Sequence, residues 1–282
     1  MNLTVTVNHK QLLDVLLNVG LIRPVFIWGA PGIGKSAIVQ QFAGQLGLEC
    51  VSLLGSQLAP EDIIGVPQIR DGFSQFCPPR TIAREQPYVL FLDELNACTA
   101  EVQKAFYSLI HERRIGEYRL PEGSIVVGAG NRAQDNAITR PMSSALVNRM
   151  FHVELTASPR LWLEWAARNG IHPYVYDYIS SRPDHLWSKP PKSEEPFSTP
   201  RSWHMLSDAI QSYGPDVSVT ACGCWRRGAS APSTPPSFWP TSGRCAASTP
   251  WIRFYPANSP GRAGRRSGTC CISWPSPSAP GW

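Results

Sequence analysis

A glycine-rich loop between an apolar run and a helical run is the feature that most constrains the fold. Residues 24–28 are mostly apolar and partly β-branched, which predicts a buried strand. The pattern Gly29-x-x-x-x-Gly34-Lys35-Ser36 follows directly and opens a helical run. Glycines let backbone N–H groups surround phosphate oxygens, and the helix N-terminus adds its dipole to the same anion. The stretch therefore predicts a nucleoside triphosphate site.

Each position of this loop has an expected part in binding. The Lys35 side chain would reach the β- and γ-phosphates, and the Ser36 hydroxyl would bind Mg²⁺. The expected cofactors are therefore ATP and Mg²⁺. The residues expected to bind the nucleotide are Gly29, Ala30, Pro31, Gly32, Ile33, Gly34, Lys35 and Ser36.

Two later apolar runs also end in polar residues. The run 87–93 ends in Asp93 and Glu94, and the run 126–130 ends in Asn131. Asp93 would hold Mg²⁺ directly or through water, while Glu94 would act as general base on the attacking water. Asn131 would position that water against the γ-phosphate. Taken alone, an Asp-Glu pair after a strand is more often a turn, and Asn131 could be a loop residue in a left-handed turn.

Two arginines complete the candidate catalytic set of Glu94, Asn131, Arg149 and Arg201. Arg149 ends a short helical run and is expected to reach a neighbouring subunit's site. The alternative is a solvated arginine beside the helix dipole. Arg201 stands at a helix start, where its charge opposes the dipole, so a nearby anion such as the γ-phosphate would explain it.

Apolar and helical runs alternate through the first part of the chain. Strands are expected at residues 25–28, 49–54, 87–93, 124–129 and 151–155, and helices at 35–46, 100–113 and 143–150, after a first helix capped by Asn8. Hairpin signals lie at 69–73 and 116–123. Alternation of this kind predicts an α/β fold, a three-layer domain with a parallel sheet.

The pattern then becomes helical and finally loses its periodicity. Helices are expected at 161–169, at 173–180 and, with Thr199 as its cap, from Pro200 to about 211, with a linker at 182–197. We expect a nucleotide-binding core at 1–157, a partial helical lid at 158–215 and a disordered tail at 216–282. Residues 217–282 include seven Arg and ten Pro but no Asp, Glu, Lys or Leu, so they have little with which to build a core. Two interpretations stay open, a natural disordered tail and a frameshift near residue 217 of a GC-rich gene.

Composition excludes several other classes of protein. No apolar run reaches the roughly 18 residues that a membrane span needs, and the first residues do not resemble a signal peptide, so the cytoplasm is the expected location. The net charge of +5 comes from the last 66 residues, because the first 216 carry 19 basic and 21 acidic residues. A nucleic-acid partner is therefore not expected. The eight cysteines form no CxxC pair that would indicate a zinc site.

The motifs, taken in their order along the chain, resemble those of AAA+ ATPases. They are Walker A at 29–36, Walker B at 92–96, sensor 1 at 130–132, the arginine finger at 145–149 and sensor 2 at 198–201. The segments 58–65 and 114–122 resemble the MoxR branch. The resemblance covers about residues 1–213. It implies the AAA+ P-loop fold with a helical lid, a homo-oligomer in the form of a hexameric ring, and ATP bound between subunits.

The resemblance also implies a function. MoxR-type ATPases are chaperones that remodel or mature protein complexes, often with a partner that contains a von Willebrand factor A domain. We therefore expect Mg-dependent ATP hydrolysis that acts on a protein client. The alternatives are a nucleotide-binding module that no longer hydrolyses ATP and a nucleic-acid motor. Because later lid helices are missing from the sequence, we also expect Trp203, Leu206 and Ile210 to be partly exposed.

Overall fold

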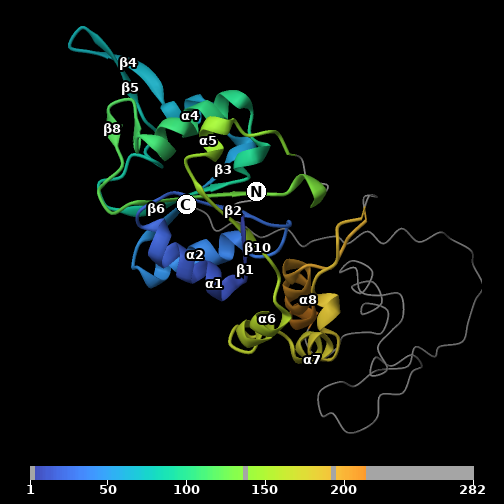
Figure 1. The fold of residues 1–282 in the computed structure, drawn as a ribbon. Helices are drawn as coiled ribbons and strands as arrows, with labels where there is room; N and C mark the ends of the chain where they lie inside the picture. Colours follow the sequence, from blue (N-terminus) through green and yellow to red (C-terminus); the bar gives the residue numbers. More distant parts are fainter. Residues whose placement is uncertain (1–3, 136–138, 192–194, 214–282) are drawn as a thin grey trace, which may run out of the picture.

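A six-stranded parallel sheet forms the centre of the molecule (Figure 1). The computed structural model describes residues 4–135, 139–191 and 195–213. The strand order is β1-β10-β2-β9-β6-β3, and every neighbouring pair is parallel. The strands are β1 (Val5–Val7), β2 (Val25–Trp28), β3 (Glu49–Leu54), β6 (Tyr88–Asp93), β9 (Ile125–Gly130) and β10 (Phe151–Leu155).

Helices cover both faces of this sheet, as Figure 1 shows. One face packs against α1 (His9–Val15), which continues as a π-helical segment, and α2 (Lys35–Gln45). The other face packs against α3 (Glu61–Ile64), α4 (Ala100–His111) and α5 (Ser144–Val147). Two separate apolar clusters fill the layers, so the expected three-layer α/β fold is confirmed.

The central strands explain why the sequence shows apolar runs without alternation. Every residue of β9 is buried, and so are the first five of β6, because helices cover both of their faces. Since β2, β6 and β9 are parallel, the residues that follow them emerge at one edge of the sheet. That edge carries the glycine loop, Asp93 with Glu94, and Asn131.

One strand of the sheet was not predicted. β1 has only three residues and pairs with β10, with Val7 opposite Leu155. A run this short gives no reliable periodicity in the sequence. Its position leads the chain directly into Asn8, which caps α1 through a capping box with Gln11 and so confirms that predicted cap.

Two antiparallel hairpins extend from the sheet. The first, β4 (Val66–Arg70) with β5 (Phe73–Cys77), projects away from the body and is longer than the hairpin expected at 69–73. Its apolar residues are exposed, with Ile69 at 84% and Phe73 at 73%. The second hairpin pairs β7 (Arg114–Ile115) with β8 (Tyr118–Arg119).

The last described helices form a compact unit beside the sheet domain. They are α6 (Pro159–Ala166), α7 (Pro173–Ser181), a 3-10 turn η5 (Pro183–Leu186) and α8 (Pro200–Tyr213). The turn η5 lies inside the segment expected to be a linker, where it buries Leu186. Thr199 caps α8 by accepting a hydrogen bond from Ser202 N at 3.1 Å, as the sequence predicts.

The expected exposure of α8 is wrong. Trp203, Leu206 and Ile210 are at most 5% exposed, because α6, α7 and η5 cover them. The Trp203 ring lies 5.2 Å from the Tyr178 ring, and its indole N–H donates to the His185 carbonyl at 2.9 Å. Helices that precede α8 in the chain thus supply the cover that the sequence argument assigned to later ones.

Two further expectations concern membrane spans and the C-terminal tail. Within the residues that the structure describes, no helix has the length and apolarity to cross a membrane. The predicted tail at 216–282 lies outside the described residues.

The burial of Trp203 generates a stability prediction. We expect Trp203→Ala to lower the free energy of unfolding by about 3–5 kcal/mol, because a buried aromatic side chain and its hydrogen bond are both lost. Met205→Ala on the same helix is the control, since Met205 is 64% exposed and its loss should cost under about 0.5 kcal/mol. Urea denaturation followed by tryptophan fluorescence measures both, and equal midpoints would contradict the packing described.

Candidate active site

The glycine loop connects β2 to α2 in the conformation that an anion site requires. Gly32 and Gly34 have φ angles of +73° and +104°, values that residues with a side chain rarely adopt. A Cβ at Gly32 would also lie 2.8 Å from Thr199 Oγ1. No side chain caps the N-terminus of α2, so its first N–H groups are left for a ligand.

Lys35 is buried beneath this loop. Its ammonium donates hydrogen bonds to the Gly29 carbonyl at 2.8 Å, the Ala30 carbonyl at 3.2 Å and Asn131 Oδ1 at 2.8 Å. Burial lowers its pKa from 10.5 to about 8, against the opposing charges of Asp93 and Asp135. Among the described residues only neutral oxygens accept hydrogen bonds from the ammonium, so its charge would favour an anionic ligand at this position.

Two oxygen donors suited to Mg²⁺ lie together next to the loop. The Ser36 hydroxyl donates to Asp93 Oδ2 at 2.8 Å. A hydroxyl and a carboxylate are hard ligands of the kind that Mg²⁺ takes along with substrate phosphates and water. Among the described residues no group of three or more His, Cys, Asp or Glu forms a metal site. Ser36 and Asp93 are thus the two candidate metal donors at this position.

Glu94 occupies a strained position beside Asp93. Its φ of +54° is left-handed, which costs a residue with a side chain about 1 kcal/mol or more. Its carboxylate accepts a hydrogen bond from the Ser56 hydroxyl, at the turn after β3. The carboxylate is only partly buried, so a water molecule has access to it.

Asn131 is held from two sides. Its side-chain oxygen contacts Lys35, while its backbone is bonded to the side chain of Asn96 in the 3-10 turn after Glu94. The Gly29 N–H also donates to the Gly130 carbonyl at 3.2 Å, which joins the start of the loop to the end of β9. Two hydrogen-bonded pairs, Lys35 with Asn131 and Ser36 with Asp93, thus make up the polar group of the site, and the charge of Asp93 acts on Lys35.

Arg132 and His9 support this group from outside. Arg132 donates two hydrogen bonds of 2.8 Å to Asp135 and a third to Glu154, and these contacts raise the pKa of Arg132. His9 Nε2 lies 3.0 Å from the Ile33 carbonyl, below the glycine loop. Burial lowers the pKa of His9, which favours the neutral ring that donates to this carbonyl.

The helical unit contacts the loop through the start of α8. The Arg201 N–H donates to the Gly32 carbonyl at 3.2 Å, directly beside Thr199. The Arg201 side chain is exposed, and no other described residue forms an ion pair with it. Its charge still reaches the site, because it helps to lower the pKa of Lys35. Arg201 would therefore lie close to an anion if one bound in the loop.

No described contact joins Arg149 to the glycine loop or to this group. Its guanidinium lies 4.8 Å from the centre of the Tyr107 ring, and Nη1 donates to the Ala145 carbonyl at 2.8 Å. The Nε atom is buried and has no hydrogen-bond partner among the described residues. Arg149 therefore lies against its own chain, between α4 and α5.

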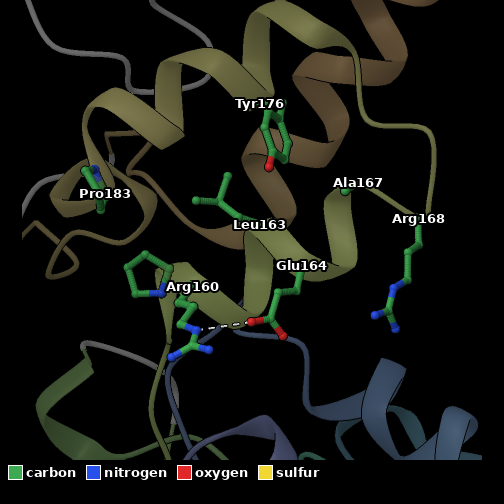
Figure 2. Close-up of a pocket in the computed structure, with 8 residues that line it drawn as sticks. Arg160, Leu163, Glu164, Ala167, Arg168, Tyr176 and Pro183 are labelled. Atoms are coloured by element: carbon green, nitrogen blue, oxygen red, sulfur yellow. Dashed lines mark hydrogen bonds and ion pairs between the residues drawn. The ribbon is translucent and has the colours of Figure 1, made fainter.

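Two cavities adjoin the helical unit. One, of about 300 Å³, lies between the loop and η5 and is lined by Ile33, Arg132, Thr156 and Trp187. The Trp187 indole N–H is buried and has no hydrogen-bond partner among the described residues. The other cavity, of about 700 Å³, lies on the helical unit itself, where Figure 2 shows Leu163 and the Arg160–Glu164 ion pair.

A comparison with protein families now agrees with this geometry. Residues 24–150 match the family described as "AAA domain (dynein-related subfamily)". Over this stretch the chain is similar to an AAA domain. The match begins one residue before β2 and ends one residue before β10, so it spans the glycine loop, both polar strand ends and Arg149. The parallel sheet with helices on both faces is the AAA+ P-loop fold.

Individual relatives are distant and much longer. The chain is 28% identical over 169 residues to midasin from Giardia intestinalis, which covers 56% of this chain and 4% of midasin. It is 31% identical over 146 residues to proteasome-activating nucleotidase 1 from Haloferax volcanii, which covers 45% of this chain and 34% of that protein. The chain therefore spans about a third or less of either relative.

Among solved structures, the chain resembles the RuvB Holliday junction branch migration motor of Thermotoga maritima. The TM-score is 0.48 and the sequence identity 16%, over 79% of this chain and 65% of the motor.

Three supporting residues were not found by the sequence argument. Asn96, Ser56 and His9 each contact a candidate residue that lies 24 or more positions away in the chain. Asn96 stands two residues after Glu94, so its place in the Walker B segment is the signal that could have found it. Ser56 and His9 lie outside every motif and carry no comparable signal.

The buried charge of Lys35 generates a prediction for the protein without ligand. Between pH 8 and 10.5 the unfolded chain holds the Lys35 proton more tightly than the folded one, so the free energy of unfolding should rise with pH there. The gain attributable to Lys35 should reach about 3 kcal/mol. Lys35→Met removes this titration, so the difference between the two proteins in urea denaturation isolates it. Parallel pH profiles would show that Lys35 is not buried as described.

Proposed function

We propose that this protein binds and hydrolyses Mg-ATP and uses the energy to remodel or mature a protein complex, as MoxR-type AAA+ chaperones do. The observation that carries the proposal is the meeting of Lys35, Asp93, Glu94 and Asn131 at one sheet edge beneath the glycine loop. A loop of this kind followed by an acidic strand end is the arrangement that phosphoryl transfer requires.

Each of these residues, and Arg201 as well, has a distinct part in the proposed reaction. Lys35 would leave the Gly29 and Ala30 carbonyls to contact the β- and γ-phosphates, which compensates the burial of its charge. Glu94 would accept the proton of the attacking water, and the Asn131 carboxamide would orient that water. Arg201 would contact the γ-phosphate from the start of α8.

The metal site would be formed by Ser36 and Asp93, whose oxygens already lie 2.8 Å apart. When bound, Mg²⁺ supplies charge neutralisation of the β- and γ-phosphate oxygens. The cavity of about 300 Å³ beside Ile33 would offer room for the rest of the nucleotide.

The finer parts of the proposal come from the resemblance to MoxR-type ATPases. They are a hexameric ring, ATP bound at the subunit interface, a protein client, a partner with a von Willebrand factor A domain, and a cytoplasmic location. The division into a core at 1–157, a partial lid at 158–215 and a tail from 216 belongs to the same proposal. A module that binds ATP without hydrolysing it, and a nucleic-acid motor, are the competing functions.

Glu94→Gln tests the proposed chemistry. The amide keeps the shape of the side chain and cannot accept a proton, so Mg-ATP should still bind while phosphate release slows by about 100-fold or more. Fluorescent-nucleotide titration and a phosphate-release assay measure the two properties. Glu85→Gln, in the loop before β6, is the matched control and should behave as wild type. Turnover that survives in Glu94→Gln would exclude Glu94 as the base. If the wild-type protein binds Mg-ATP and does not hydrolyse it, the non-hydrolysing module is favoured.

Arg149 tests whether the site is shared between subunits. Arg149→Ala should leave nucleotide affinity nearly unchanged and reduce turnover by about 1,000-fold, because an arginine supplied in trans stabilises the charge of the transition state. Mixing the Arg149→Ala and Glu94→Gln proteins should restore part of the activity. Some interfaces of the mixed oligomer then join a subunit with an intact Glu94 to a neighbour with an intact Arg149. If mixed oligomers are seen by native mass spectrometry and show no rescue, the trans role of Arg149 is wrong.

A further inference from the structure

Asn96 is a buried amide at the end of the segment 92–96, where it contacts the active-site group and has no assigned role of its own. It is 3% exposed and lies in the 3-10 turn η3 (Leu95–Ala97), directly after Glu94. Its Nδ2 donates to the Asn131 carbonyl at 2.7 Å, and its Oδ1 accepts from the Asn131 N–H at 3.2 Å. One side chain thus satisfies both backbone groups of Asn131.

These two bonds replace strand pairing at a point where it has ended. The ladder between β6 and β9 runs from Val89 opposite Ile125 to Leu92 opposite Gly128. Beyond it the chain turns away at Glu94, whose φ is +54°. The carboxamide of Asn96 has one donor and one acceptor, as a peptide group does, so it extends the pairing to residue 131.

Asn96 has little freedom to move. A Cβ added at Gly130 would lie 2.4 Å from Asn96 Oδ1 and 2.7 Å from Phe26 Cζ, so the side chain is packed against the β9 backbone. The Asn96 carbonyl accepts a hydrogen bond from Arg140 N at 2.6 Å, which fixes its backbone as well. The contact to Asn131 is therefore held from both ends.

The side chain of Asn131 depends on this contact for its direction. Its Oδ1 accepts from Lys35 Nζ at 2.8 Å, while its backbone is the group that Asn96 holds. If ATP draws Lys35 away, Asn96 is the remaining described side chain that fixes residue 131. Resting on the proposed function, we propose that Asn96 is a positioning residue that keeps the Asn131 carboxamide directed at the attacking water during ATP hydrolysis.

A purely structural role predicts a different result. If Asn96 only filled a buried polar position, its loss would lower stability, and any loss of turnover would add to that of other substitutions. If it acts through Asn131, its loss should matter only while Asn131 keeps its side chain. A double-mutant cycle between the two residues separates these cases.

The test compares four variants of the full chain. Asn96→Ala removes both bonds. Asn96→Asp keeps the acceptor for the Asn131 N–H and sets a carboxylate oxygen against the Asn131 carbonyl. Asn131→Ala and its combination with Asn96→Ala complete the cycle. Gln103→Ala is the matched control, because Gln103 is also a buried amide and donates to the Cys98 carbonyl at 3.4 Å.

We expect kcat for ATP to fall by about 10- to 100-fold in Asn96→Ala and Asn96→Asp, as for a displaced catalytic group. KM and the affinity for Mg-ATPγS should change by less than about 3-fold. In the Asn131→Ala background, Asn96→Ala should change kcat by less than about 2-fold. Without nucleotide, hydrogen exchange of the Asn131 amide should be faster by about 10-fold or more in Asn96→Ala and unchanged in Gln103→Ala.

Each outcome decides the inference. Wild-type kcat in Asn96→Ala with fast exchange at Asn131 would overturn it and leave the proposed function intact. Additive losses in the cycle, or an equal loss of kcat in Gln103→Ala, would also overturn it in favour of a structural role. If Asn96→Ala does not fold, the same comparison is made with Asn96→Asp. If the wild-type protein binds Mg-ATP and does not hydrolyse it, the proposed function is overturned instead.

Discussion

The buried ammonium of Lys35 is the constraint on which the rest of the site depends. A charge in this position is costly unless polar groups surround it, and here two loop carbonyls and one amide oxygen do so. Those carbonyls point at Lys35 only because the glycines of the loop allow its tight course. The third partner, Asn131, follows β9 and reaches Lys35 because β9 lies beside β2. The environment of Lys35 therefore depends on the order of the strands in the sheet.

The sheet also explains why so few residues can form the site. In a parallel sheet every strand delivers its last side chains to the same edge, and the crossover helices cover the faces. Strands β2, β9 and β6 are adjacent in the sheet, and each leads into motif residues. The neighbouring strand β10 contributes support through the Arg132–Glu154 contact, which ties the end of β9 to β10.

The sequence predicts those parts of the site that a local pattern specifies. The glycine loop, the acidic end of β6 and the cap of α8 each lie within a few residues, so propensity and spacing are sufficient. Contacts that join distant segments have no such pattern. Asn96 and Asn131 are 35 positions apart, and nothing in either segment specifies the other.

The error at α8 has a related cause. The apolar side of the helix was visible in the sequence, but its partners were not, because periodicity shows that a face is buried and not what buries it. Trp203, Leu206 and Ile210 pack on α6, α7 and η5, which come earlier in the chain. Similarly, three residues were too few to indicate β1, although its pairing with β10 is regular.

The hydrogen bond between the Arg201 N–H and the Gly32 carbonyl has a consequence for how genetic variants are interpreted. Because the main chain makes this bond, every side chain except proline would preserve it. Replacing the guanidinium would therefore leave the helical unit tethered to the glycine loop and remove only a positive charge. Residue 201 thus couples the two units in two separate ways, electrostatically through its side chain and mechanically through its main chain. Natural variation at this position would change the electrostatic coupling and keep the mechanical one.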